Sequence, residues 1–238
     1  MFFNENFKSI QIDVTKAKQL LDCELRSLPI ETNAVLEVPI SLSEIRNAIA
    51  KGKSHKAPGN DGIGLEFYKS EWETIKTDLL QILLNSMYLD GTILENQLKG
   101  IIVCIPKHAH PITIDDCRPL TLMNTDYKIL TRIIAARLRQ FLADMIHPNQ
   151  YYGIPGKSVF EAVAAVRDAI TQAEIFQKPL CALSIDFSAA FDKMSHEYLY
   201  MALEAHGLSA CFRQKIRRLY EQATSEILIN GFRSIKYR

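Results

Sequence analysis

The sequence has few cysteines, no long apolar run and no excess of one charge. Its five cysteines are widely spaced and include no C-x-x-C pair, so neither a zinc site nor a disulfide framework is indicated. The most apolar stretch, residues 101–105, is far too short to span a bilayer, and the first residues lack the basic region and apolar run of a signal peptide. We therefore expect neither membrane insertion nor secretion, and an intracellular protein of the cytoplasm or nucleus.

The formal net charge is only +1, which gives no overall attraction for phosphate groups. Any binding of nucleic acid has to come from local basic clusters, although such clusters are more often solvated faces. The clusters lie at residues 51–56, 213–218 and 233–238. The 238 residues are enough for one or two domains with an apolar core, and they contain no repeat or Gly/Ser linker.

Apolar periodicity, caps and turns predict a mixture of helices and strands. Ser41 with Glu44 has the spacing of a capping box and predicts a helix through residue 50. A buried strand is predicted at residues 100–105, and the Asn-Gly pair at 230–231 predicts a tight hairpin within residues 227–232. Further helices are predicted at about residues 14–28, 77–89, 127–145, 158–177, 196–207 and 209–223.

The stretch LSIDFSAAFD, residues 183–192, is typical of a strand that ends in an acid. Period-two alternation directs Leu183, Ile185 and Phe187 to one face, which we expect to be a core, and Asp186 to the other face. A carboxylate at a strand end suits Mg²⁺, which prefers oxygen ligands. The alternative interpretation is an Asp that caps the next helix.

Five motifs in order resemble the reverse transcriptase of non-LTR, LINE-type retrotransposons, from about residue 40 to the C-terminus. KAPGNDGI at residues 56–63, followed by FYK at 67–69, is similar to the family's K-x-P-G-x-D-G-I opening. IPK at 105–107 and CRPLTLMN at 117–124 follow, the latter similar to R-P-[IL]-[ST]-L-x-N. Gln150 with GIPGKS at 153–158 is similar to Q-x-G-F-x-P-G-[RK]-S, and residues 186–192 fall where the family has its first catalytic motif.

The resemblance implies an α+β fold, with a helix-rich fingers subdomain and a partial palm of a right-hand polymerase. We expect an N-terminal helical extension at residues 1–39, a fingers-like part at 40–177 and an incomplete palm at 178–238. The implied partners are an RNA template, a DNA primer and deoxynucleoside triphosphates.

The resemblance also implies roles for residues of the active site. Asp186 is the expected catalytic acid, which bridges two Mg²⁺ ions, and the main-chain carbonyl of Phe187 is expected to help bind the metal of the triphosphate. Lys107 and Arg118 are expected to bind the triphosphate, because they offer a compact charge and a bidentate fork. Phe191 matches the position whose ring excludes a 2′-hydroxyl; the alternative is an ordinary core aromatic.

Two basic regions are candidate contacts for nucleic acid. Glycines beside Lys53 and Lys56, including Gly59, allow close approach of backbone amides to phosphates, although such loops are common without a ligand. In the predicted helix 127–145, basic residues lie opposite the apolar arc and form a stripe that suits a nucleic-acid backbone, or equally a solvated helix face. These residues are Lys128, Arg132 and Arg139.

The sequence also departs from the family pattern. It contains neither the [FY]-x-D-D hairpin nor the Q-G-x-P-[LQ]-S segment, and its one Asp-Asp pair, Asp115-Asp116, is interpreted as a polar connection between strands. We therefore expect the front portion of a polymerase that is inactive by itself, with Mg²⁺ as the cofactor of the intact family. The alternatives are a non-enzymatic RNA-binding module and an inert retrotransposon relic. The sequence does not predict an oligomeric state.

Overall fold

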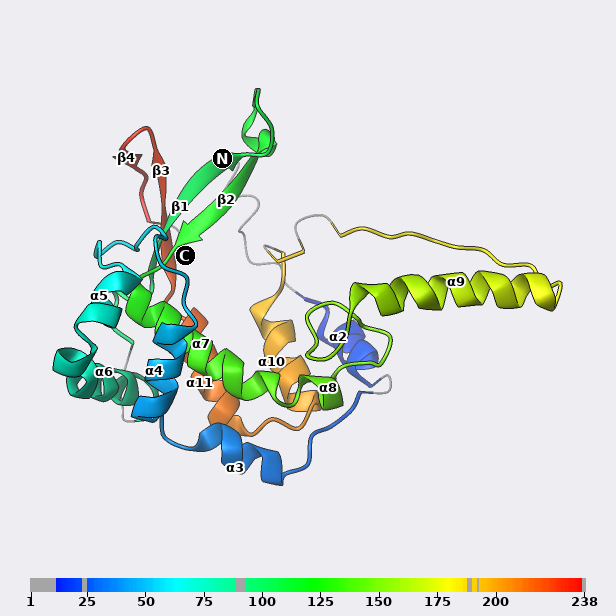
Figure 1. Cartoon of the computed structure of the whole chain (residues 1–238), viewed down its shortest axis with the longest axis horizontal. Helices are drawn as coiled ribbons and strands as arrows, with labels where there is room; N and C mark the ends of the chain where they lie inside the picture. Colours follow the sequence, from blue (N-terminus) through cyan, green and yellow to red (C-terminus); the bar gives the residue numbers. More distant parts are fainter. Residues whose placement is uncertain (1–11, 23–24, 89–92, 188–189, 192, 237–238) are drawn as a thin grey trace. The chain divides into compact units, whose positions relative to one another are not determined.

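The computed structural model describes residues 12–22, 25–88, 93–187, 190–191 and 193–236 (Figure 1). The chain divides into two compact units, each built from two separate stretches of sequence. Unit 1 comprises Met1–Asn33 and Arg137–Ser209, and unit 2 comprises Ala34–Ala136 and Ala210–Arg238. The subdomain boundaries expected at residues 40 and 178 stay a prediction.

The secondary structure mixes helices with one sheet, and the predicted α+β class is confirmed. The helices of unit 1 are α2 (Val14–Leu21), α8 (Leu142–Met145), α9 (Val159–Ile175) and α10 (His196–Ala205). Those that lie wholly or mainly in unit 2 are α3 (Glu31–Glu37), α4 (Leu42–Ala50), α5 (Leu65–Ser70), α6 (Trp72–Met87), α7 (Thr125–Arg139) and α11 (Ala210–Tyr220). The strands are β1 (Lys99–Pro106), β2 (Cys117–Leu122), β3 (Thr224–Ile229) and β4 (Phe232–Arg233), with a 3₁₀ turn η1 (Ile114–Asp116) before β2.

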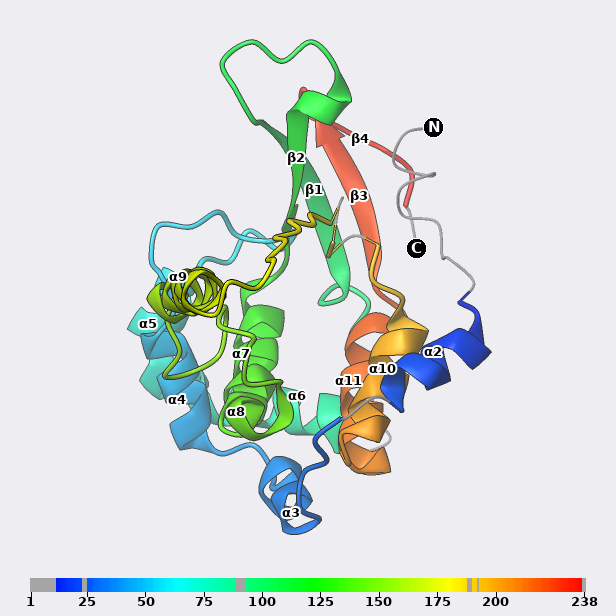
Figure 2. The same cartoon turned by 90° about the vertical axis from the view of Figure 1, so that its right-hand side faces the viewer.

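The sheet of unit 2 has the order β2-β1-β3-β4. β1 pairs with β2 in antiparallel and with β3 in parallel orientation, and Ile102 lies opposite both Thr121 and Ile227. β3 and β4 form the hairpin predicted from the Asn-Gly pair: Asn230 and Gly231 have φ values of 49° and 83°, which a tight turn of this kind requires. Figure 2 shows the three long strands side by side, with the β1–β2 connection extending past the end of the sheet.

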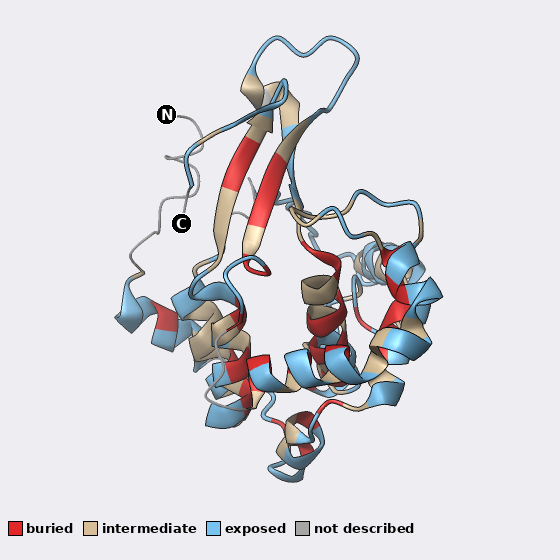
Figure 3. Cartoon of the chain, turned by 90° about the vertical axis from the view of Figure 1, so that its left-hand side faces the viewer, coloured by how far each residue is buried: buried red, intermediate tan, exposed pale blue. Residues whose placement is uncertain are grey.

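The core of unit 2 is formed by apolar faces of α4, α6 and α7. Ile45, Leu83 and Ile129, one from each of these helices, are fully buried. The predicted capping box is confirmed, since Ser41 accepts from the backbone of Glu44 and the Glu44 carboxylate accepts from the backbone of Ser41. Residues 100–102 of β1 and 226–227 of β3 are buried as well (Figure 3).

Unit 1 is held by contacts around the end of α10. Gly207, with φ +80°, ends this helix, and the backbone N–H of Leu28 donates to the His206 carbonyl at 2.9 Å. The Asn33 side chain donates to the Gly207 carbonyl at 3.0 Å and accepts from the Ser209 N–H at 2.8 Å. In contrast, α9 buries none of its residues.

Three helix predictions differ clearly from the structure in their bounds. The helix expected over 77–89 begins earlier, at Trp72. The helix expected over 14–28 ends at Leu21, and residues 25–29 have no helical structure. The helix expected over 127–145 is divided into α7 and α8 at residues 140–141. In the part of the chain that the structure describes, no helix has the length and apolar character needed to cross a membrane.

Candidate nucleic-acid and nucleotide interface

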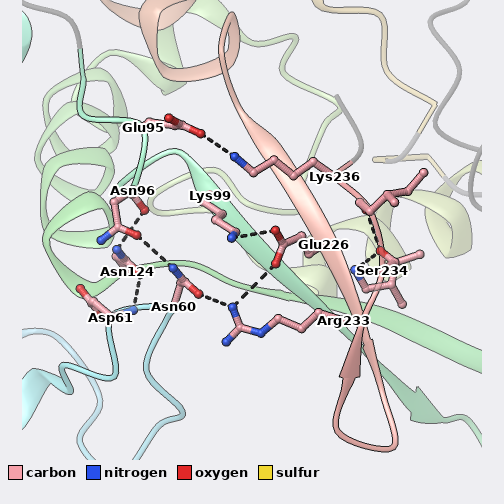
Figure 4. A network of polar contacts seen from close by, with 12 residues as sticks. Asn60, Asp61, Glu95, Asn96, Lys99, Asn124, Glu226, Arg233, Ser234 and Lys236 are labelled. Atoms are coloured by element: carbon pink, nitrogen blue, oxygen red, sulfur yellow. Dashed lines mark hydrogen bonds and ion pairs between the residues drawn. The ribbon is translucent and has the colours of Figure 1, made fainter.

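The loop at residues 56–63 is fixed against Asn124, the last residue of the CRPLTLMN motif at 117–124 (Figure 4). A Cβ placed on Gly59 would lie 2.2 Å from Asn124 Oδ1 and 2.3 Å from the Asn124 backbone nitrogen, so only glycine fits. The backbone N–H of Asp61 donates to Asn124 Oδ1 at 3.3 Å. Gly59 therefore supports the loop through close packing.

The Asn124 side chain is almost completely buried, and both of its polar atoms are hydrogen-bonded. Its Nδ2 donates to the Asn96 carbonyl at 3.0 Å. Next along the chain, Thr125 Oγ1 donates to the Ile63 carbonyl at 2.7 Å. Asn124 and Thr125 thus join two stretches that lie about sixty residues apart in the sequence. Breaking these hydrogen bonds would leave buried polar groups without partners, which is costly in free energy. Asn124 ends the CRPLTLMN motif, but no role was predicted for it from the sequence.

The residues just before the loop are also held in place, next to two exposed lysines. Lys69 Nζ donates to the Gly52 carbonyl at 3.2 Å and to Ser54 Oγ at 2.8 Å. Lys53 and Lys56 are exposed. An ordered loop with two exposed cations can offer charge to phosphates without first paying the entropy of ordering its backbone.

The three basic residues predicted on α7 have different environments. Arg139 is exposed, whereas Arg132 is half-buried and its NH1 donates to the Ala48 carbonyl at 2.7 Å. That carbonyl lies in the last turn of α4 and lacks a partner within the helix, so Arg132 caps α4. Burial lowers the pKa of Lys128, while the nearby Asp61 raises it. The predicted contacts of these residues with nucleic acid stay a prediction.

Lys107 and Arg118 lie at the end of the β1–β2 pair where β1 ends and β2 begins. Arg118 is opposite Ile105, and the backbone N–H of Lys107 donates to the Asp116 carbonyl at 2.7 Å. Lys107 directly follows the last residue of β1, and Arg118 is the second residue of β2. The pairing of β1 with β2 therefore brings both exposed cations to the same end of the strand pair.

The connection between β1 and β2 is organised by Asp116. Its Oδ2 accepts hydrogen bonds from the backbone N–H groups of Ile112 and Thr113, both at 2.9 Å, and its Oδ1 lies 3.3 Å from His108 Nε2. These hydrogen bonds, the two from the backbone above all, lower the pKa of Asp116 from 3.8 to about 2. The interpretation of Asp115-Asp116 as a polar connection between strands is confirmed.

The strand predicted at residues 183–187 does not form. Residues 181–187 have no regular secondary structure, and Leu183, Ile185 and Phe187 are exposed to more than two thirds, so the expected core face is wrong. A strand is stable only when a neighbour satisfies its backbone N–H and C=O groups, and no described strand pairs with this segment. Asp186 is exposed, and the Phe191 side chain is 95 % exposed, which excludes a core aromatic within the described structure.

The proposed site residues divide between the two units. Unit 2 contains Lys53, Lys56, Gly59, Lys107, Arg118, Lys128 and Arg132, and unit 1 contains Arg139, Asp186, Phe187 and Phe191. Among the described residues, no group of three or more His, Cys, Asp and Glu side chains is arranged to hold a metal ion. The magnesium site expected at Asp186 and Phe187 stays a prediction.

Comparisons with known proteins support the sequence resemblance. The family described as "Reverse transcriptase (RNA-dependent DNA polymerase)" matches residues 105–235, a range that includes Arg118 and Asp186. The "Transposon TX1 uncharacterized 149 kDa protein" of Xenopus laevis is 33 % identical over 195 residues, which cover 82 % of this chain and 15 % of that protein.

Two further relatives are Pol polyproteins of retrotransposable elements. The "Retrovirus-related Pol polyprotein from type-1 retrotransposable element R1" of Bradysia coprophila is 27 % identical over 69 % of this chain and 16 % of its own length. The corresponding R2 polyprotein of Popillia japonica is 28 % identical over 71 % of this chain and 23 % of its own length. The chain thus spans less than a quarter of each of these relatives.

The predicted resemblance to non-LTR retrotransposon reverse transcriptases is confirmed by these matches, and with it the right-hand polymerase fold class. Members of this family generally use divalent metal ions and act on a nucleic-acid template with deoxynucleoside triphosphates. The match extends over more than half of the sequence. The chain therefore belongs to the reverse transcriptase (RNA-dependent DNA polymerase) family.

Proposed function

We propose that the chain provides the template-binding and nucleotide-binding part of the RNA-directed DNA polymerase domain of a non-LTR retrotransposon. The observation that carries this proposal is the joining of residues 56–63 to Asn124, because it brings two of the matched motifs into one ordered structure. The proposed partners are an RNA template, a DNA primer and deoxynucleoside triphosphates. Such a function belongs inside the cell, in the cytoplasm or nucleus.

The basic residues have separate roles in this proposal. Lys107 and Arg118 bind the triphosphate at the end of the β1–β2 pair where β1 ends and β2 begins, where the guanidinium supplies a bidentate fork and the ammonium a compact charge. Lys53 and Lys56 contact the backbone of the template strand. Lys128, Arg132 and Arg139 extend this contact along α7. The Arg132 side chain does so from where its NH1 binds the Ala48 carbonyl in the last turn of α4.

Asp186 is the proposed catalytic residue. The Phe187 carbonyl is the proposed second oxygen toward magnesium, and the Phe191 ring is the proposed contact with the deoxyribose. Magnesium supplies charge stabilisation for phosphoryl transfer when it is bound. The 238 residues contain neither the [FY]-x-D-D motif nor the Q-G-x-P-[LQ]-S segment, so we propose that they do not extend a primer by themselves.

Primer extension tests this proposal directly. The purified chain is incubated with oligo(dT) annealed to poly(rA), dTTP and Mg²⁺, next to an Asp186→Ala variant and an active reverse transcriptase as the positive control. We expect no extension by either form. Extension by the unaltered chain that Asp186→Ala abolishes would contradict the proposed inactivity, and it would show that other groups supply the missing ligands.

A non-enzymatic RNA-binding module is the second candidate function. It is favoured by the exposed Lys53 and Lys56 at the edge of an ordered loop. Fluorescence anisotropy with a labelled single-stranded RNA measures this binding. Salt-sensitive binding without extension supports the module, and the absence of binding by a folded sample supports an inert relic instead.

A further inference from the structure

We infer that Arg233, on the two-residue strand β4, is a positioning residue that holds the 56–63 loop in its RNA-binding conformation. Arg233 NH1 donates to Asn60 Oδ1 at 2.6 Å (Figure 4). Asn60 lies in the loop, and its Nδ2 donates in turn to Asn96 Oδ1 at 3.0 Å. The expected effect of Arg233 on RNA binding rests on the proposed function. Its expected effect on the loop rests on the observed contacts alone.

The guanidinium of Arg233 is itself held by a nearly buried carboxylate. Glu226 lies within β3, opposite Ile101 of β1, and its side chain is 10 % exposed. Glu226 Oε1 lies 2.7 Å from Lys99 Nζ, and Oε2 lies 3.7 Å from Arg233 NH1. One carboxylate, itself nearly buried, therefore bridges a cation of β1 and a cation of β4.

The backbone on both sides of Arg233 is fixed as well. Arg233 pairs with Leu228 across the hairpin. The N–H of Ser234 donates to the Ile227 carbonyl, and the Ile227 N–H donates to Ser234 Oγ, both at 2.9 Å. Arg233 thus extends toward the loop from a hydrogen-bonded support.

One nitrogen of the Arg233 guanidinium faces both partners. NH1 donates to Asn60 Oδ1 and lies 3.7 Å from Glu226 Oε2, so the carboxylate holds the same nitrogen that binds the loop. The link also passes through Asn60, which carries no charge. Substituting Asn60 therefore tests the positioning role without changing the attraction between Arg233 and RNA phosphates.

The state of the loop is tested first, without RNA. Trypsin cleaves after Lys56 only when the loop opens, and we compare the cleavage rates of the unaltered chain, Arg233→Gln, Asn60→Ala and the double variant. Each single variant is expected to accelerate cleavage about tenfold, as expected for the loss of one charge-assisted hydrogen bond. The double variant is expected to be no faster than the single ones. Unchanged cleavage in Arg233→Gln, or additive effects in the double variant, would overturn the inference.

The affinity for a labelled single-stranded RNA is tested second, with the same four proteins. We expect Arg233→Gln and Asn60→Ala to weaken binding to the same degree, with no further loss in the double variant. Lys76→Gln, which removes a half-buried cation of α6 that pairs with Glu73, is the matched control and is expected to bind as the unaltered chain does. A loss confined to Arg233→Gln would make Arg233 a direct phosphate contact and overturn the positioning role.

Glu226→Gln adds a test in which the two explanations differ in sign. Removal of a negative charge strengthens RNA binding if only overall attraction matters. If Glu226 holds Arg233, the same change weakens binding and accelerates cleavage after Lys56. Circular dichroism shows whether each variant is folded. The Arg233 side chain is almost half exposed, so Arg233→Gln is expected to fold and keeps the inference testable if Glu226→Gln does not fold. If the unaltered chain binds no RNA, the proposed function fails while the cleavage data still decide the role of Arg233.

Discussion

At the residue scale, Gly59 determines whether the 56–63 loop can pack against Asn124. A methyl group there would meet the Asn124 backbone nitrogen at 2.3 Å and the Met123 carbonyl carbon at 2.5 Å. Backbone atoms cannot rotate away as a side chain can, so the loop would have to move. We predict that Gly59→Ala lowers the free energy of unfolding by about 1–3 kcal/mol, which urea denaturation measures.

Gly64→Ala is the matched control for this substitution. Gly64 begins α5, and its added methyl group would come within 3 Å only of the flexible Glu66 carboxylate. Its cost is expected to stay below about 1 kcal/mol, the usual difference between glycine and alanine at a helix N-cap. Equal losses for the two substitutions would contradict the close packing of Gly59 on Asn124.

Asp116 links loop structure to pH. The pKa of its carboxyl group is lowered to about 2 by the backbone hydrogen bonds from Thr113 and Ile112. Because the folded pKa lies below the ordinary value of 3.8, the stabilisation is complete above that value and is lost as the pH falls toward 2. We predict that carboxyl NMR gives Asp116 a midpoint near 2, and that Asp116→Asn removes the pH dependence of the loop amides. A midpoint near 3.8 would show that the hydrogen bonds are absent in solution.

The element scale shows which patterns in the sequence carry enough information. The capping box at Ser41 and the Asn-Gly turn at 230–231 were predictable because each depends on neighbouring residues only. The segment 183–187 has the alternation of a strand, but a strand also needs a partner, and alternation says nothing about one. The contact of Gly59 with Asn124 was likewise beyond the sequence, since local composition does not show which distant residue approaches a glycine.

Helix α9 is an element whose apolar residues do not contribute to a core. Val163 and Val166 are 63 % and 59 % exposed, and no residue of α9 is buried. We predict that Val163→Glu and Val166→Glu change the free energy of unfolding by less than about 0.5 kcal/mol, since glutamate also has the higher helix propensity. Light scattering should show less association, because an exposed apolar patch is removed.

The comparison for α9 is Leu83→Ala in α6. Leu83 is fully buried in the core of unit 2, and its truncation is expected to cost about 2–5 kcal/mol. A loss of similar size for Val163→Glu would mean that another surface covers α9 in the folded protein. The same urea titrations measure both changes.

At the scale of the whole molecule, 28 basic and 27 acidic residues nearly cancel. The protein as a whole therefore attracts RNA weakly, and affinity must come from cations placed by structure. Lys53 and Lys56 are exposed beside a loop that Asn124 and Lys69 hold in place. Binding at this loop is therefore distinguished from general attraction by the number of phosphates that contact the lysines, and not by the net charge.

The salt dependence of RNA affinity counts those contacts. Each contact with a single strand contributes about 0.7 to the slope of log K against log salt concentration, so the double substitution Lys53→Gln with Lys56→Gln is predicted to reduce the slope by about 1.4. Lys76→Gln removes a charge that pairs with Glu73 and is predicted to leave the slope unchanged. If all losses of charge reduce the slope alike, RNA responds only to net charge. A reduction confined to the loop lysines instead means that the template backbone lies against the 56–63 loop, since counterions are released only where phosphate and cation meet.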